Sequence, residues 1–132
     1  MKPLVFAAAL LVALTAAPTA SAKGCVRIEV ASAAAVGERV RVTVRTYAST
    51  VAKGQVVPGA PTYLAIPHFK VTATGPGGRR FQFPVRRLGD GTVRVAHIAF
   101  AAPGLWRLTA TNWTYAPRSC APPVLVRVGN LR

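Results

Sequence analysis

The stretch 38–47, ERVRVTVRTY, has the most regular alternation in the chain and decides its fold class. Hydrophobic residues alternate here with polar ones: Val40, Val42 and Val44 against Arg39, Arg41, Thr43 and Arg45. Strict alternation is typical of a β-strand that buries one face and exposes the other. The stretch therefore predicts a strand with valines in the core and arginines in solvent.

The same pattern recurs on both sides of this strand, with Gly and Pro between the repeats. Helix signals are nearly absent after residue 36, which favours an all-β sandwich or barrel. A small-residue crossing is expected at 31–37, a long irregular connection at 48–67, and a bulge near Ala96, where the alternation changes phase. Pro84 cannot donate a ladder hydrogen bond, so its strand is expected at a sheet edge. We expect seven strands, at about 25–30, 38–47, 68–74, 79–86, 92–100, 105–111 and 123–128.

Seven strands in a chain of this length match the immunoglobulin-like antiparallel β-sandwich. In that fold the second-to-third, fourth-to-fifth and sixth-to-seventh connections lie at one end, together with the start of the first strand. Cys25 begins the first strand and Cys120 precedes the last, so this topology brings the two cysteines to the same end. This differs from the bridge of antibody domains, and no tryptophan lies on the third strand, so the resemblance is one of architecture.

The first 22 residues have the features of a secretion signal. A positive start is followed by an apolar stretch at 4–17 and by Ala20-Ser21-Ala22, which fits cleavage before Lys23. The apolar stretch is shorter than the roughly 20 residues that a membrane-spanning helix needs. We therefore expect residues 1–22 to be removed, residues 23–132 to form one domain, and the product to be secreted or extracytoplasmic.

Two cysteines in an exported chain are most simply one disulfide, here Cys25–Cys120. Lipidation of Cys25 stays open as an alternative. A charged residue two places before the cysteine is a poor fit to a lipoprotein signal, so the disulfide is favoured.

The domain is strongly basic. Residues 23–132 hold 16 Lys and Arg against Glu29, Glu38 and Asp90, a formal charge of +13. Such a surface attracts polyanions, unless the arginines are only a solvated surface. An exported chain meets anionic envelope polymers, acidic lipid headgroups or acidic proteins sooner than nucleic acid. In the sandwich the predicted outward positions of one sheet make a basic face: Arg27, Arg39, Arg41, Arg45, Arg80, Arg86 and Arg94. The other sheet is expected to carry fewer cations.

The two tryptophans have different expectations. Trp106 alternates in phase with Leu108 and is predicted to be core. Trp113 follows the end of the alternation, in the last loop. Loops on a rigid scaffold commonly carry binding residues, so we predict a binding end formed by Trp113, Tyr115, Arg118, Tyr63 and His68. The alternative for Trp113 is a lid over the core.

Catalytic and metal sites are not indicated. Glu29 and Glu38 lie at positions that the alternation directs to solvent, and Asp90 lies in a turn. The sequence therefore shows no pair of acids that could share a catalytic cleft. His68 and His97 are expected at opposite ends of the sandwich, and metal binding needs several convergent ligands. We predict a non-enzymatic protein without metal or cofactor.

Two further motifs carry a family resemblance. Gly37, Val40, Val42 and Val44, and then Pro103, Gly104, Trp106 and Leu108, form the patterns G-x-x-V-x-V-x-V and P-G-x-W-x-L. They resemble the small exported bacterial Ig-like domains of the YtkA-like type, over about a quarter of the domain. Some of those relatives are associated with copper or envelope assembly. The only methionine here is Met1, so the resemblance implies no copper site.

The expected function is a binding or adhesion module at the cell envelope. It would attach to an anionic polymer or a partner through the basic face and the aromatic loop end, as a monomer. A peripheral contact with a membrane is compatible with the charge. The alternatives are an accessory or chaperone-like domain that binds another exported protein, and a copper-handling YtkA-like relative.

Overall fold

The computed structural model describes residues 24–66, 68–111 and 123–130. Within these ranges the chain is all-β, apart from one 3₁₀ turn, η3 (Pro76–Gly78). The strands are β1 (Gly24–Glu29), β2 (Ala33–Ala35), β3 (Val40–Ala52), β4 (Gln55–Pro61), β5 (Lys70–Thr74), β6 (Arg80–Pro84), β7 (Arg86–Leu88), β8 (Val93–Ile98), β9 (Gly104–Thr111) and β10 (Val124–Gly129).

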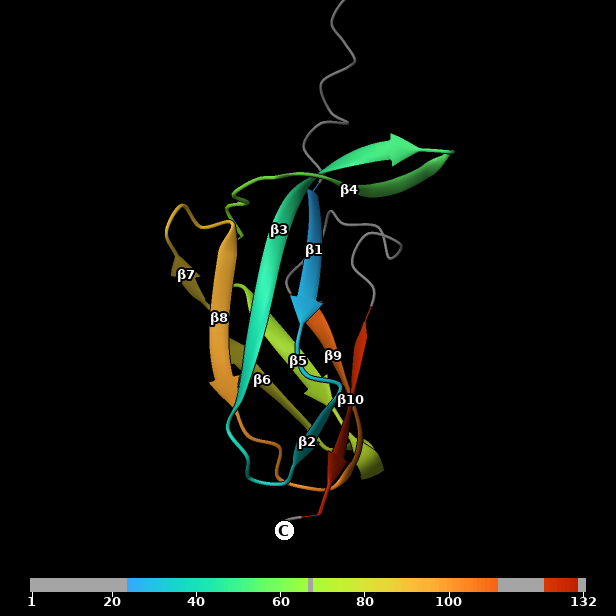
Figure 1. Ribbon diagram of the computed structural model, residues 1–132, viewed down its shortest axis with the longest axis vertical. Coiled ribbons are helices and arrows are strands. Elements are labelled where there is room, and N and C mark those ends of the chain that lie inside the picture. The colour runs from blue at the N-terminus through green and yellow to red at the C-terminus, as the bar shows by residue number, and fades with distance from the viewer. Residues whose placement is uncertain (1–23, 67, 112–122, 131–132) are drawn as a thin grey trace, which may run out of the picture.

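The strands form two sheets that face each other (Figure 1). Sheet A has the order β1-β3-β8-β7, with β4 paired to the far part of β3. Sheet B has the order β2-β10-β9-β5-β6. In sheet B, β2 runs parallel to β10, and every other pair is antiparallel. This strand order is that of an immunoglobulin-like sandwich, so the predicted fold class is confirmed.

The inward residues of both sheets make one core. The valines of the deciding stretch, Val40, Val42 and Val44, are buried, as are Leu108 and Val126 from sheet B. Trp106 is 1% exposed and packs against the rings of Phe81 and Phe100. Its prediction as a core residue is confirmed.

The first strand changes sheets, because small residues let the chain cross. β1 pairs with β3 in sheet A, and β2, made only of alanines, pairs with β10 in sheet B. The backbone N–H of Arg127 donates to the carbonyl of Ser32 between them, over 2.8 Å. The expected small-residue crossing is thus itself partly a strand.

The prediction of an irregular connection at 48–67 is wrong for residues 48–61. β3 continues to Ala52, turns through Lys53 and Gly54, and returns as β4 (Figure 1). Both turn residues have positive φ, 53° and 78°, which is the geometry of a type I′ hairpin turn. The Lys-Gly pair was the signal for this turn, and residues 62–66 of the connection have no regular structure.

The single strand expected at 79–86 is two strands on different sheets. β6 is the outer strand of sheet B, and β7 is the outer strand of sheet A. Pro84 ends β6, so its place on an edge strand is confirmed. The missing N–H of Pro84 helps the chain to leave one ladder before it joins the other.

The bulge expected near Ala96 is also wrong. β3 pairs with β8 in one unbroken register from Val40 opposite Ile98 to Arg45 opposite Val93. Val93 and Val95 therefore lie on the outer face of sheet A, while Arg94, Ala96 and Ile98 lie on the inner face. The change in the hydrophobic alternation arises because Arg94 occupies an inward position. The backbone of β8 itself stays regular.

Candidate functional site

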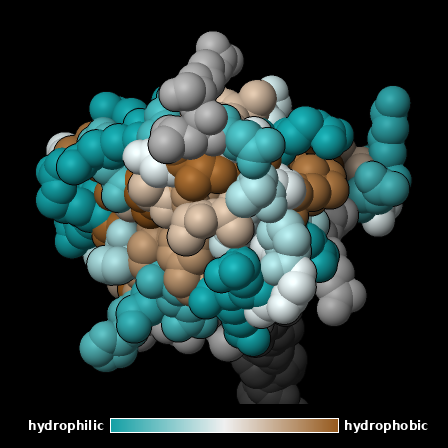
Figure 2. All heavy atoms as spheres, turned by 90° about the horizontal axis from the view of Figure 1, so that it is seen from below, coloured by the Kyte–Doolittle hydropathy of each residue, from teal (hydrophilic) through white to brown (hydrophobic). Residues whose placement is uncertain are grey.

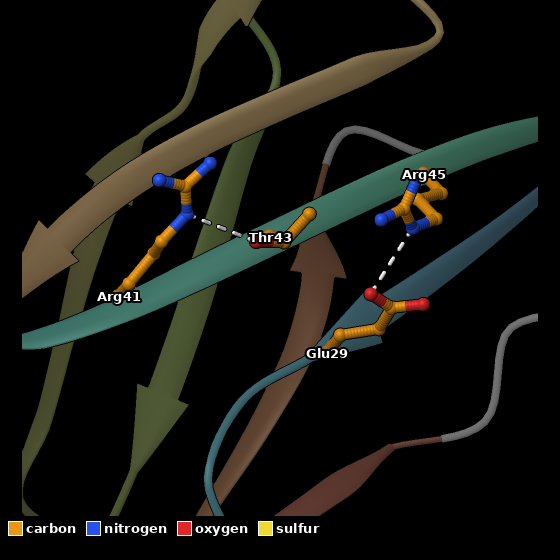
Figure 3. Close-up of polar contacts among 4 residues, drawn as sticks. All are labelled: Glu29, Arg41, Thr43 and Arg45. Atoms are coloured by element: carbon orange, nitrogen blue, oxygen red, sulfur yellow. Dashed lines mark hydrogen bonds and ion pairs between the residues drawn. The ribbon is translucent and has the colours of Figure 1, made fainter.

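The outer face of sheet A carries four of the predicted cations, on three strands. Arg27 on β1 lies directly opposite Arg45 on β3, so two like charges share one cross-strand pair. The Arg45 Nε donates to Glu29 Oε1 over 3.0 Å (Figure 3), and about half of each side chain remains exposed. This is the ion pair found in the described part of the chain. It leaves Arg27 without a matched acid on this face.

Two more arginines extend this face toward the other strands. Arg41 on β3 contacts the hydroxyl of Thr43 at 3.5 Å (Figure 3) and lies opposite the exposed His97 of β8. Arg86 on β7 lies opposite Val95, and Arg39 is exposed just before β3. We call the outward residues Arg27, Glu29, Arg41, Arg45 and Arg86 the sheet A face.

Arg80 was assigned to the same face, and the structure corrects this. It begins β6, pairs with Thr74 and therefore lies on the outer face of sheet B. Lys70, Arg107 and Arg127 lie on that face too, so the expected shortage of cations on sheet B is wrong. The reason is the change of sheet after Pro84, which separates Arg80 from Arg86.

Sheet B also exposes two large hydrophobic residues that sequence reasoning did not single out. Leu105 and Leu125 are about half exposed. In the register of β9 and β10, Leu105 lies opposite Arg127 and Leu125 lies opposite Arg107. The sequence does indicate this exposure, because Leu105 and Leu125 directly precede the inward residues Trp106 and Val126 and so alternate to the outer face.

Arg94 was predicted to be outward, and this is the second correction. It is 3% exposed and lies opposite Val44, on the inner face of sheet A. Its Nη2 donates to the carbonyl of Leu64 over 2.6 Å, and its guanidinium lies 5.2 Å from the centre of the Phe69 ring. Burial lowers the pKa of Arg94 below the usual range of an arginine.

Tyr63 lies against two arginines, one of which sequence reasoning missed. The carbon at the centre of the Arg87 guanidinium is 4.3 Å from the centre of the Tyr63 ring, and that of Arg94 is 5.4 Å away. Arg87 Nη1 also donates to the Tyr63 hydroxyl over 3.2 Å. Arg87 lies directly opposite Arg94 in the register of β7 and β8. We call Tyr63, Phe69, Arg87 and Arg94 the top-end cluster.

The turn between β7 and β8 fits closely around this cluster. Gly91 has a φ of 87°, and a side chain there would meet the Tyr63 ring. Asp90 accepts hydrogen bonds from the Thr92 N–H and hydroxyl, over 2.9 and 2.8 Å. The bond from the Thr92 backbone is the main reason that the pKa of Asp90 lies below its usual value of 3.8.

The rest of the predicted loop end is described only in part. His68 is exposed, with a φ of 53°, and directly precedes Phe69. Trp113, Tyr115, Arg118 and Cys120 lie outside the described residues, as do residues 1–22. Cys25 is fully buried at this end, and the described part of the chain contains no free cysteine.

The described carboxylates each bind a nearby group of the protein, and the described histidines do not join them in a cluster. Glu29 pairs with Arg45, Glu38 accepts from the Ala35 N–H over 2.8 Å, and Asp90 caps its turn. Within the described ranges, no three His, Cys, Asp or Glu side chains gather where a metal could bind. Nor do those ranges contain a helix long and apolar enough to cross a membrane.

The opposite end of the sandwich is closed by small residues. Figure 2 shows this end, with hydrophobic residues gathered at its centre and hydrophilic ones around them. An open hollow beside β2 is lined by residues 33–38, Arg127, Gly129 and Asn130. The Glu38 carboxylate, which lines this hollow, accepts a hydrogen bond from the Ala35 N–H.

Comparison with known proteins adds one structural likeness. No protein-family model matches the chain, and no curated protein sequence matches it. The chain is similar to the CARDB domain of the PF1109 protein from Pyrococcus furiosus, whose crystal structure is a complex with di-metal ions. The identity is 16%, the TM-score is 0.44, and the match covers 83% of this chain and 94% of that one. The assignment to the immunoglobulin-like sandwiches therefore rests on the strand order of this chain itself.

Proposed function

We propose that this chain is an exported, non-enzymatic binding module that attaches to an anionic polymer of the cell envelope through the sheet A face. The observation that carries the proposal is the direct pairing of Arg27 with Arg45 across β1 and β3. Like charges in such a pair repel. A polyanion laid over the face relieves this repulsion.

The geometry of the face suits an extended ligand. Arg27, Arg41 and Arg45 come from the neighbouring strands β1 and β3, Arg86 comes from the edge strand β7 beyond β8, and Glu29 is the acid among them. Strands in a sheet are about 4.8 Å apart, so these arginines are spread over several strand spacings, an extent that an extended polymer can cover. The guanidinium group of arginine forms bidentate hydrogen bonds with carboxylate and phosphate groups, and these bonds add to the electrostatic attraction for a polyanion.

Export and the disulfide are part of the same proposal. The signal-like residues 1–22 support a location outside the cytoplasm. A Cys25–Cys120 disulfide suits that compartment and would tie the start of β1 to the start of β10. The chain would act as a monomer, with no cofactor.

The resemblance to YtkA-like domains supports the sandwich fold and no particular ligand. Its residues are core positions of β3 and β9, such as Val42, Val44 and Trp106, and residues beside those strands, such as Gly37 and Pro103. These positions support a shared way of building the sandwich. They supply no ligand for copper, so copper handling is not proposed.

The test measures binding of residues 23–132, in the oxidised form, to polyphosphate and to polygalacturonate over a range of salt concentrations. One variant removes three charges from the sheet A face: Arg27→Gln, Arg41→Gln and Arg86→Gln. The matched control removes three from sheet B: Arg80→Gln, Arg107→Gln and Arg127→Gln. All six substituted side chains are exposed, so both variants should fold.

We expect the sheet A variant to lose affinity and salt dependence together. Each lost contact with a linear polyanion lowers the slope of log affinity against log salt by about 0.7–0.9, so three lost contacts lower it by about 2 to 3. The sheet B variant should keep most of the slope. Equal losses in the two variants would mean that only net charge matters, and the proposed face would be wrong.

A second candidate function is binding of another exported protein through a strand edge. It is favoured by the β3–β4 hairpin, where Val51 is 70% exposed on an arm that extends from the sandwich (Figure 1). Added strands bind chiefly through backbone hydrogen bonds and apolar side chains, so they respond only mildly to salt. Envelope binding that survives high salt, persists in the sheet A variant and is lost in Val51→Lys would favour this function.

A further inference from the structure

The side chain of Arg94 is a buried cation with incomplete hydrogen bonding. The residue is 3% exposed, and one of its two terminal nitrogens, Nη2, donates to the carbonyl of Leu64. The other nitrogen, Nη1, is buried and has no hydrogen-bond partner. Buried polar atoms are nearly always paired, so an unpartnered donor on a charged group requires an explanation.

Among the described residues, no carboxylate pairs with Arg94. Its guanidinium lies near the ring faces of Tyr63 and Phe69, which attract a cation only weakly. Its neighbour across the β7–β8 ladder is Arg87, a second cation. Neither arginine forms an ion pair with a carboxylate of the described residues.

An arginine buried without a counter-ion is unfavourable, and a second arginine beside it adds to the cost. The proximity of Arg87 contributes to the lowered pKa of Arg94, after burial. Buried cations in proteins are normally paired with an anion. The top-end cluster thus has the charge and the free donor of an anion site, without the anion.

We propose that the top-end cluster binds a single oxyanion group, a carboxylate or a phosphate, between Arg87 and Arg94. Arg94 Nη1 and Arg87 Nη1 would be its two donors. This site lies on the inner side of the sheet A edge, away from the sheet A face, so it goes beyond the attachment proposed above.

Tyr63 controls access to this site. Its side chain is 40% exposed, and its hydroxyl now accepts the hydrogen bond from Arg87 Nη1. An oxyanion would take the place of that hydroxyl as the acceptor for Arg87, and Tyr63 would turn toward solvent. Rotation of an exposed tyrosine is fast, so it does not prevent binding.

The test uses residues 23–132 and small anions that cannot bridge a protein surface. Thermal unfolding is followed at constant ionic strength while chloride is replaced by acetate or by inorganic phosphate. A bound ligand at about ten times its Kd raises the folding equilibrium constant about elevenfold. We expect a saturable stabilisation by one or both oxyanions relative to chloride, and the stronger of the two identifies carboxylate or phosphate as the preferred group.

Three variants locate the effect. Arg87→Gln should abolish the oxyanion-specific stabilisation, whereas Arg79→Gln, at an exposed arginine outside both the top-end cluster and the sheet A face, should keep it. Arg94→Met should also abolish it while the protein stays folded, because replacing an unpaired buried charge by an apolar side chain of similar length is often neutral or stabilising.

Three results would overturn the inference. They are equal stabilisation by chloride and the oxyanions, an effect that never saturates, or the same loss in Arg79→Gln as in Arg87→Gln. Each concerns small anions at the top-end cluster, and polymer binding by the sheet A face is measured separately. Failure of one proposal therefore leaves the other intact.

Discussion

At the scale of single residues, the core depends on close contact between one aromatic ring and the backbone. Trp106 is the largest fully buried side chain among the described residues, and its Nε1–H donates to the carbonyl of Ala102 over 2.9 Å. This bond satisfies the one polar group of the ring, as burial of a tryptophan requires. The backbone of Gly75 lies flat against the other part of the ring, since a Cβ there would be only 2.5 Å from Cδ2 and Cε2.

A side chain at residue 75 should therefore destabilise the protein. Gly75 has a φ of −126°, so alanine fits the backbone and the clash with Trp106 is the whole effect. We expect Gly75→Ala to lower the free energy of unfolding by about 1–3 kcal/mol, as overpacking of a core usually does. Urea unfolding measures this change. In the control Gly129→Ala, where the nearest heavy atom is 4.0 Å from the added Cβ, the change should stay within about 0.5 kcal/mol.

At the scale of elements, the largest departure from a minimal sandwich is the hairpin of β3 and β4. Its strands pair closely near the turn, with Ala52 opposite Gln55 and Val51 opposite Val56. The register shifts between Tyr47 and Ser49, where the hairpin leaves the sandwich. Beyond that shift the hairpin has little core to pack on, so its stability depends on the turn.

The turn residue Gly54 should therefore control the order of the hairpin. Its φ is 78°, a region that alanine enters only at a cost of about 1 kcal/mol. We expect Gly54→Ala to speed amide hydrogen exchange about fivefold in residues 50–57, with no change in β8 or β9. Lys53→Asn should slow the same exchange, because Asn tolerates the positive φ that Lys53 now adopts. Unchanged exchange in both variants would show that contacts other than the turn hold the hairpin.

At the scale of the whole molecule, repulsion between the positive charges opposes the packing of the two sheets against each other. A formal charge of +14 over 132 residues favours expansion of the chain. One ion pair between half-exposed side chains, Arg45–Glu29, offsets little of this repulsion. The two sheets are held by the shared core, and by the disulfide proposed at the top end.

Reduction should accordingly lower stability strongly. A Cys25–Cys120 bridge closes nearly the whole domain, and loops of that length stabilise by about 4 kcal/mol in the chain-entropy treatment. We expect the urea midpoint of residues 23–132 to fall on reduction, and Cys25→Ser with Cys120→Ser to reproduce the fall. Alkylation followed by mass measurement of the protein expressed from the full-length chain should find no free thiol before reduction. Two free thiols would contradict the bridge, whereas one free thiol together with an added lipid mass on Cys25 would identify the lipidated alternative.

Much of the architecture follows from the sequence alone. Alternation of Val with Arg and Thr in β3, and of Trp106 and Leu108 with polar residues in β9, determines which side chains are buried. Those local patterns give the fold class, the core and the edge position of Pro84. The outward places of Arg27, Arg41, Arg45 and Arg86 follow from the same alternation.

Only the tertiary structure decided the rest, because it depends on which strands become neighbours. Arg80 and Arg86 lie on different sheets since the chain changes ladder between them, and no local pattern distinguishes that change from a continuous strand. Arg94 has the inward phase of β8, but with Val93 and Val95 taken as inward and a bulge placed near Ala96, the sequence assigned it to solvent. It is tolerated inside because Tyr63, Phe69 and the carbonyl of Leu64, all distant in sequence, cover it at the end of the sandwich.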